Sequence, residues 1–105
     1  MPKYLVQGSY TDHGLEGLLK GGGSKRRAMV EQLAKEMGGK LEAFYFAVGS
    51  DDFVIVLDLP SNLDMAATAI VAQASGMIKS RVTVLMTPEE VDQAVQRKVD
   101  FRPPE

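Results

Sequence analysis

Residues 40–59 read KLEAFYFAVGSDDFVIVLDL and decide the fold. Apolar residues alternate along residues 40–48, and residues 53–59 are almost continuously apolar, so each segment is typical of a β-strand. Residues 49–52, which read GSDD, have the composition of a turn, so the two strands are expected to form an antiparallel hairpin.

Upstream of the hairpin, the sequence predicts a strand, a short helix and a longer helix. Residues 3–10 have the composition of a strand, in which Gly8 suggests a bulge or a close backbone approach. Thr11 is a candidate N-cap for the short helix, which the flexible glycines at 21–23 are expected to end. The clearest helix then begins at Ser24, and its apolar residues are spaced three and four apart: Met29, Val30, Leu33, Ala34 and Met37.

Downstream of the hairpin, a helix, a strand and a second short helix are expected. Ser61 caps the first of these helices, whose buried stripe is predicted to be Leu63, Ala66, Ala67, Ile70, Val71 and Ala74. Residues 78–86 form the fourth strand. Residues 87–90, which read TPEE, predict a capping box with proline at the first helical position. This last helix is expected to bury Val91, Ala94 and Val95.

The resulting order, β-α-β-β-α-β with a terminal helix, predicts an α+β ferredoxin-like fold with a four-stranded antiparallel sheet. Residues 1–96 are expected to form a single domain and residues 97–105 a loosely held tail. In this fold both helices cover one face of the sheet. The hairpin is apolar on both faces, because strict alternation separates Leu41 and Tyr45 from Phe44. A second copy of the chain should therefore cover the open face and form a dimeric α/β barrel.

The composition excludes several classes of protein. The 105 residues include 12 Lys and Arg, 14 Asp and Glu and no cysteine, with a formal net charge of -2. The absence of cysteine excludes a disulfide scaffold, a cysteine nucleophile and a thiolate metal site. The net charge argues against nucleic-acid binding. Since no apolar run is long enough for a membrane span or a signal peptide, we expect no membrane partner and a cytoplasmic protein.

Four motifs resemble those of the GYD domain proteins of bacteria. They are YLVQGSYT at 4–11, SKRR at 24–27, GGKLEAFYF at 38–46 and LMTPEE at 85–90, and they follow in the same order along nearly the whole chain. The resemblance implies a ferredoxin-like fold in the dimeric α/β barrel group and brings no function with it, because the family is essentially uncharacterised.

The chain departs from this family at one position. Gly49 and Asp52 match the family's Gly-Tyr-Asp type of turn, but Asp51 stands where the tyrosine would be. No role of that tyrosine, such as stacking or donating a hydroxyl proton, is therefore carried over to this chain.

The strongest candidate for a binding site is the cationic start of the second helix. Ser24, Lys25 and Arg26 follow a glycine-rich approach, and free N–H groups at a helix N-terminus attract anions. These residues could hold a phosphate, a carboxylate or an acidic partner. Alternatively, the cations pair with acids elsewhere in the fold, for example Glu16. The Gly-Lys-Ser/Thr ending of a P-loop is missing, which argues against an ATPase.

Four further residues are candidates for a functional site. Tyr10 and His13 are the candidate catalytic groups, because a phenol or an imidazole can move a proton. Tyr45 and Asp52 are candidate ligand-binding residues. The alternative roles are an incidental loop position for His13, core packing for Tyr45 and turn formation for Asp52. One histidine and no cysteine suggest no metal site, and no cofactor is expected.

Three functions remain open from the sequence. The first is a homo-oligomer that binds a small ligand, for example an anion, between the sheet and the helices. The second is a cofactor-independent monooxygenase or isomerase of the α/β barrel group, in which Tyr10 or His13 activates the substrate. The third is a structural or regulatory oligomer that uses its apolar sheet face. Whether the protein is an enzyme stays undecided at this level.

Overall fold

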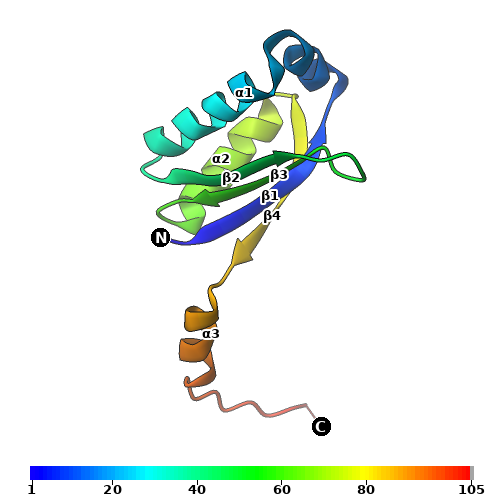
Figure 1. Ribbon diagram of the computed structural model, residues 1–105. Helices are drawn as coiled ribbons and strands as arrows, with labels where there is room; N and C mark the ends of the chain where they lie inside the picture. Colours follow the sequence, from blue (N-terminus) through cyan, green and yellow to red (C-terminus); the bar gives the residue numbers. More distant parts are fainter. Residues whose placement is uncertain (105) are drawn as a thin grey trace.

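A four-stranded antiparallel sheet with two helices on one face forms the body of the protein (Figure 1). The computed structural model describes residues 1–104, and the strand order is β2-β3-β1-β4. This is the predicted α+β ferredoxin-like fold with its extra C-terminal helix. The elements are β1 (Lys3–Tyr10), α1 (Asp12–Glu36), β2 (Lys40–Phe46), β3 (Phe53–Asp58), α2 (Asn62–Ala74), β4 (Ile78–Leu85) and α3 (Pro88–Val95).

Three of the four predicted helix starts, those at Thr11, Ser61 and Thr87, are confirmed by their caps. The Thr11 hydroxyl accepts a hydrogen bond from the N–H of Gly14, and the Ser61 hydroxyl accepts one from Asp64. Thr87 and Glu90 form the complete capping box, each side chain accepting from the other's backbone N–H. Each side chain satisfies a donor that the first turn of a helix leaves without a partner.

Helix α1 contains the break that the glycines at 21–23 predict, but the break is narrower than expected. Only Gly22 leaves helical geometry, with φ 77° and ψ 175°, so α1 consists of two helical halves joined by a kink at one residue. This backbone region is essentially restricted to glycine. The kink sets the direction of the second half, which carries the cationic residues.

The core lies between the sheet and the two helices. Its three most completely buried large side chains are Tyr4, Phe53 and Leu59. Gly8 lies in the centre of the sheet, where a Cβ atom would collide with the backbone carbonyl of Lys79, so the predicted close approach is confirmed. The other buried apolar residues are Val6, Ala34, Ile55, Leu57 and Met65.

The predicted division of side chains along β2 is wrong at its start. Leu41 pairs with Leu57, the register then shifts, and Phe44 pairs with Ile55. A bulge adds one residue and thereby reverses the alternation. Leu41 consequently packs against the core together with Phe44, on the opposite side of the sheet from Tyr45.

The predicted buried stripe of α2 is also wrong. Leu63, Ile70 and Val71 are 80%, 68% and 70% exposed, while Met65 is buried and Ala69 packs against the core. The reason lies at the start of the helix, where the Tyr4 hydroxyl donates a 2.6 Å hydrogen bond to the side-chain oxygen of Asn62. Because this bond turns Asn62 towards the sheet, residues three and seven positions further on face the sheet as well.

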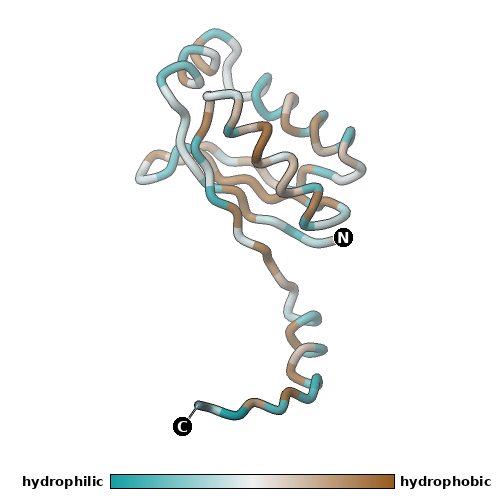
Figure 2. Tube along the Cα trace, turned by 180° about the vertical axis from the view of Figure 1, so that it is seen from behind, coloured by the Kyte–Doolittle hydropathy of each residue, from teal (hydrophilic) through white to brown (hydrophobic). Residues whose placement is uncertain are grey.

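Helix α3 lies apart from the sheet, which contradicts the prediction that it buries Val91, Ala94 and Val95. Residues 86 and 87 carry the chain beyond the end of β4, so α3 has no surface of its own domain to cover (Figure 1). The radius of gyration is 16.7 Å, whereas a compact chain of this length has about 13 Å. Figure 2 shows hydrophobic positions between hydrophilic ones along this segment.

The predicted tail at 97–105 follows α3, and residues 97–104 form neither helix nor strand. Its last residue, Glu105, lies outside the described residues. Among residues 1–104, no helix has both the length and the apolar character that crossing a bilayer requires.

Candidate functional site

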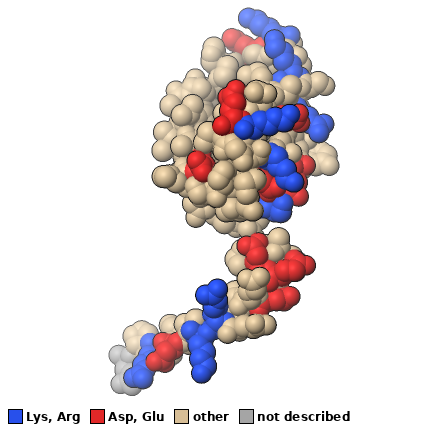
Figure 3. All heavy atoms as spheres, turned by 90° about the vertical axis from the view of Figure 1, so that its left-hand side faces the viewer, with Lys and Arg blue, Asp and Glu red and all other residues tan. Residues whose placement is uncertain are grey.

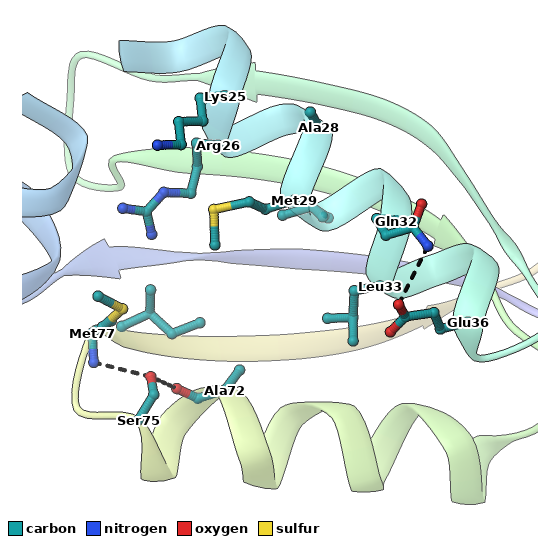
Figure 4. Close-up of a pocket in the computed structure, with 12 residues that line it drawn as sticks. Lys25, Arg26, Ala28, Met29, Gln32, Leu33, Glu36, Ala72, Ser75 and Met77 are labelled. Carbon is teal, nitrogen blue, oxygen red and sulfur yellow. Dashed lines mark hydrogen bonds between the residues drawn. The ribbon is translucent and has the colours of Figure 1, made fainter. Parts of the chain in front are cut away.

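An open groove runs between α1 and α2 above the sheet, and we call it the interhelix groove (Figure 4). Its volume is about 670 Å³, which lies in the range of small-molecule sites. The walls are largely apolar: Met29 and Leu33 from α1, Ala72 from α2, Met77 just before β4 and Ile78 at its start.

The groove extends beyond this central part. A cavity of about 230 Å³ adjoins it at Lys25 and Arg26, and another of about 180 Å³ adjoins it at Leu33 and Ala72. The wall formed by α2 consists largely of small side chains, which leave space that larger residues would fill. An elongated molecule could therefore lie along the groove.

The two ends of the groove differ in charge. Lys25 and Arg26 line one end, and Lys20 lines the cavity that adjoins it. Glu36 lies at the other end, where its carboxylate accepts a 3.3 Å hydrogen bond from the side-chain amide of Gln32 (Figure 4). Within residues 1–104, no ion pair involves Lys20, Lys25 or Arg26, so the pairing with Glu16 that the sequence left open is not formed.

Arg26 is held in place by aromatic and backbone contacts. Its guanidinium carbon lies 5.3 Å from the centre of the Tyr10 ring, and Nη2 donates a 3.4 Å hydrogen bond to the carbonyl of Gly14. The Tyr10 ring in turn lies 5.1 Å from that of Phe53, centre to centre. A cation over an aromatic face is attracted by the ring while its remaining N–H groups stay free to bind.

The half-buried phenol of Tyr10 is a protonated group. Burial raises the pKa of Tyr10 above its ordinary value of 10.0, the Arg26 guanidinium opposes the increase, and the Asp52 carboxylate adds to it. Tyr10 can therefore donate a hydrogen bond at neutral pH, and it is a poor general base.

Asp52 connects the hairpin loop to β1. Its carboxylate accepts a 3.0 Å hydrogen bond from the backbone N–H of Tyr10, and its own N–H donates to the carbonyl of Gly8 at 2.8 Å. The structure thus brings together three of the candidate residues, Tyr10, Arg26 and Asp52. Of these, Arg26 lines the interhelix groove.

The remaining candidates lie elsewhere. Tyr45 is 69% exposed and pairs with Val54 on the face of the sheet opposite the helices. Ser24 is exposed just after the Gly22 kink and does not line the interhelix groove. His13 is exposed in the first turn of α1, and its side chain forms no hydrogen bond with the described part of the chain, residues 1–104.

Sequence reasoning missed the apolar part of the groove. Met29 belongs to the apolar stripe predicted for the second helix, and methionine at a helical spacing usually fills a core. The structure leaves Met29 57% exposed in the groove wall. The spacing of the apolar residues along α1 does not distinguish a side chain that packs against α2 from one that faces the groove.

Asp51, at the position of the family's turn tyrosine, has a defined partner. Its carboxylate binds the guanidinium of Arg81 on β4, and both line a polar cavity of about 280 Å³ on the open face of the sheet. The opposite charges of Asp51 and Arg81 are visible in the sequence. The sequence alone does not show that the two residues lie together, because that depends on the order of the strands in the sheet.

Comparison with known proteins gives one result that bears on the family. A search of curated proteins and a search of solved structures find no match. The family model described as GYD domain matches residues 4–95, which cover the sheet, both packed helices and α3. On this match and on the motifs within it, the chain belongs to the GYD domain family.

Proposed function

We propose that the protein binds a small amphipathic anion in the interhelix groove, with the apolar part of the ligand between α1 and α2 and the anionic group at Lys25 and Arg26. One observation carries the proposal. An apolar groove ends at two cations that have no acidic partner among residues 1–104.

The chemistry of the groove suits a monocarboxylate with an extended apolar body. The guanidinium of Arg26 offers a planar set of donors that matches a carboxylate, and its contact with Tyr10 fixes the plane. Met29 and Met77 line the space next to it, and their flexible thioethers adapt to different apolar shapes. We expect recognition of a chemical class rather than of a single shape.

We further propose that the protein is a homo-oligomer joined through the open face of the sheet. The register places Leu5, Val54 and Val56 on this face, where they are only half-buried. Ion pairs of Lys3 with Glu42 and Asp58 lie on the same face. A second copy would cover the apolar residues and keep these charges at the rim.

The catalytic alternative has less support from the geometry. His13 is exposed in the first turn of α1, and Tyr10 is protonated with Arg26 against its ring. A purely structural oligomer would use the open face and leave Lys25 and Arg26 without a role.

Binding of decanoate and of decanol tests the proposal, since the two differ only in the anionic group. We expect decanoate to bind more tightly by calorimetry. Arg26→Gln should weaken decanoate binding about tenfold or more, because a hydrogen bond to a charged group contributes about 1.5–3 kcal/mol. Decanol binding should stay unchanged in this variant.

Arg27→Gln is the matched control, because Arg27 is the adjacent cation on α1 and does not line the groove. It should bind decanoate like the unchanged protein. Equal binding of decanoate and decanol, or equal losses in the two variants, would contradict an anion site at Arg26.

A further inference from the structure

The segment after β4, residues 86–104, is a C-terminal arm whose helix exposes an apolar stripe. Val91 and Val95 are four residues apart and therefore lie on the same side of α3, with Ala94 next to them. Val91 is 46% and Val95 76% exposed. A short amphipathic helix with an exposed stripe commonly binds in an apolar groove.

We propose that α3 docks in the interhelix groove of a second copy of the chain, with Val91 and Val95 against Leu33 and Ala72. The walls of this groove are apolar, and so is the stripe. The distribution of charge and the direction of the chain favour the groove of a second copy over the arm's own groove.

The sign of the charge reverses from one end of the arm to the other, as it does from one end of the groove to the other. The start of α3 carries Glu89, Glu90 and Asp92, and Arg97 and Lys98 follow its end. Figure 3 shows a cluster of acidic side chains on the part of the arm nearest the sheet and mainly basic ones further out, a part of the arm that also contains Asp100. When the acidic start of α3 lies at the cationic end of the groove, the basic residues lie at its acidic end.

The lengths are comparable, the charged part of the arm being about 4 Å shorter than the groove. From Lys25 to Glu36 the groove follows about 16 Å of the α1 axis, at 1.5 Å per residue. From Glu89 to Arg97, α3 and the residues after it span about 12 Å if they continue at the same rise. Both charged ends of the helix can thus be paired at once.

The arm leaves its own domain at the acidic end of the groove. Leu85, the last residue of β4, pairs with Lys3. Lys3 binds the side chain of Asp58, and the backbone of Gly39, just after α1, lies against the carbonyl of Asp58. The end of β4 and the end of α1 near Glu36 are therefore at the same end of the sheet.

Folding back into its own groove would give the arm the wrong direction. Its acidic first turn would lie at Glu36, and Arg97 and Lys98 would approach Lys25 and Arg26. A second copy can present α3 in the opposite direction, which pairs unlike charges at both ends. Two copies can exchange arms reciprocally, since each has one arm and one groove.

Docking would also regulate the proposed function, and this part of the inference depends on it. The arm and the anionic ligand would occupy the same groove, so they would compete. The docking itself depends only on the groove and the arm.

Cysteine pairs test the docking, because the natural chain contains no cysteine. Two single variants, Leu33→Cys and Val95→Cys, are mixed in equal amounts with different affinity tags and oxidised. We expect a disulfide between the two kinds of chain. It should form about tenfold faster than in the control mixture of Leu19→Cys with Val95→Cys, because docking raises the effective concentration. Leu19 is exposed on the first half of α1 and does not line the groove.

The double variant Leu33→Cys/Val95→Cys on one chain tests whether the arm occupies the groove of a second copy or its own groove. A disulfide between chains supports exchange, whereas a disulfide within one chain would overturn the second copy as the occupant. Equal rates in the Leu33 and Leu19 mixtures would overturn docking in the groove. Lys25→Glu should slow cross-linking, and Asp92→Lys on the partner chain should restore it.

Decanoate binding to Val91→Asp tests the competition. This variant should bind decanoate more tightly than the unchanged protein, because its arm no longer occupies the groove. If cross-linking supports docking but neither protein binds decanoate, the proposed function fails and the docking stands. If both proteins bind decanoate equally and cross-linking matches the Leu19 control, the docking fails and the proposed function stands.

Discussion

The carboxylate of Asp51 and the guanidinium of Arg81 form a bidentate ion pair, with N–O distances of 3.0 and 2.8 Å. Asp51 belongs to the loop between β2 and β3, and Arg81 lies opposite Gln7 of the intervening β1. The pair therefore ties the hairpin loop to β4 across the first strand. In this chain, an ion pair occupies the position of the family's turn tyrosine.

Replacing Arg81 by glutamine should lower the melting temperature at neutral pH and have progressively less effect in acid. Hydrogen bonds from Arg81 hold the pKa of Asp51 below its ordinary value of 3.8. The carboxylate therefore stabilises the fold fully above that value, and this stabilisation is lost as pH falls through the lowered pKa. Melting curves of both proteins across this range measure the difference. Lys79→Gln serves as control, and a gap that stays constant in acid would contradict the assignment.

Removing the buried hydroxyl in Tyr4→Phe should cost about 1 kcal/mol of unfolding free energy, the usual contribution of a hydrogen bond. Its partner Asn62 is exposed and can bind water instead. Asn62→Leu should cost more, about 1–3 kcal/mol, because it leaves the hydroxyl of fully buried Tyr4 without an acceptor. Urea unfolding compares the two variants, and the reverse order would refute this account.

Gly22→Ala should destabilise the protein by about 1–3 kcal/mol, because its backbone lies in a region that only glycine adopts readily. Apart from the adjacent residues and the nearby backbone of the helix itself, no atom lies within 4 Å of the position of the added Cβ, so the loss would report backbone strain. Gly21→Ala is the matched control, since Gly21 has no positive φ and its new Cβ would meet only the flexible Lys25 side chain. Thermal unfolding should show a clearly larger loss for Gly22→Ala.

A charge on the open face of the sheet should separate the copies of the proposed homo-oligomer. Val54→Lys places an ammonium group among apolar residues that a second sheet would cover, and desolvating it opposes association. Leu63→Lys, on the exposed side of α2, is the control and should leave the mass in solution unchanged. Light scattering measures this mass. A Val54→Lys protein that is folded and has the same mass as the control would place the interface elsewhere.

The fold could be predicted from the sequence wherever local chemistry decides it. The capping residues Thr11, Ser61 and Thr87 mark helix starts because each bond joins residues three apart. The errors arose where a distant contact decides the outcome. Tyr4 turns α2 through Asn62, although 58 residues separate the two in sequence.

The candidate site shows the same limit. Lys25 and Arg26 were identifiable from their charges next to the glycines, but the contact of Arg26 with Tyr10 depends on how α1 crosses β1. The apolar walls were not identifiable, because Met29 and Leu33 have the same periodicity as core residues. For α3 the error was the reverse, because residues predicted to be buried are exposed. An amphipathic pattern indicates that a helix has an apolar side to cover, but it does not indicate which surface covers it.

The kink at Gly22 gives the two halves of α1 different mechanical roles. The second half packs on the sheet through Ala34, whereas Gly17 and Lys20 of the first half form one wall of the cavity next to Arg26. The first half is also anchored at its start, where the backbone N–H of Thr11 donates to the carbonyl of Met77 and its hydroxyl donates to that of Gly76. The backbone conformation of the single residue Gly22 thus sets the angle between the two halves, and with it the width of the cationic end of the groove.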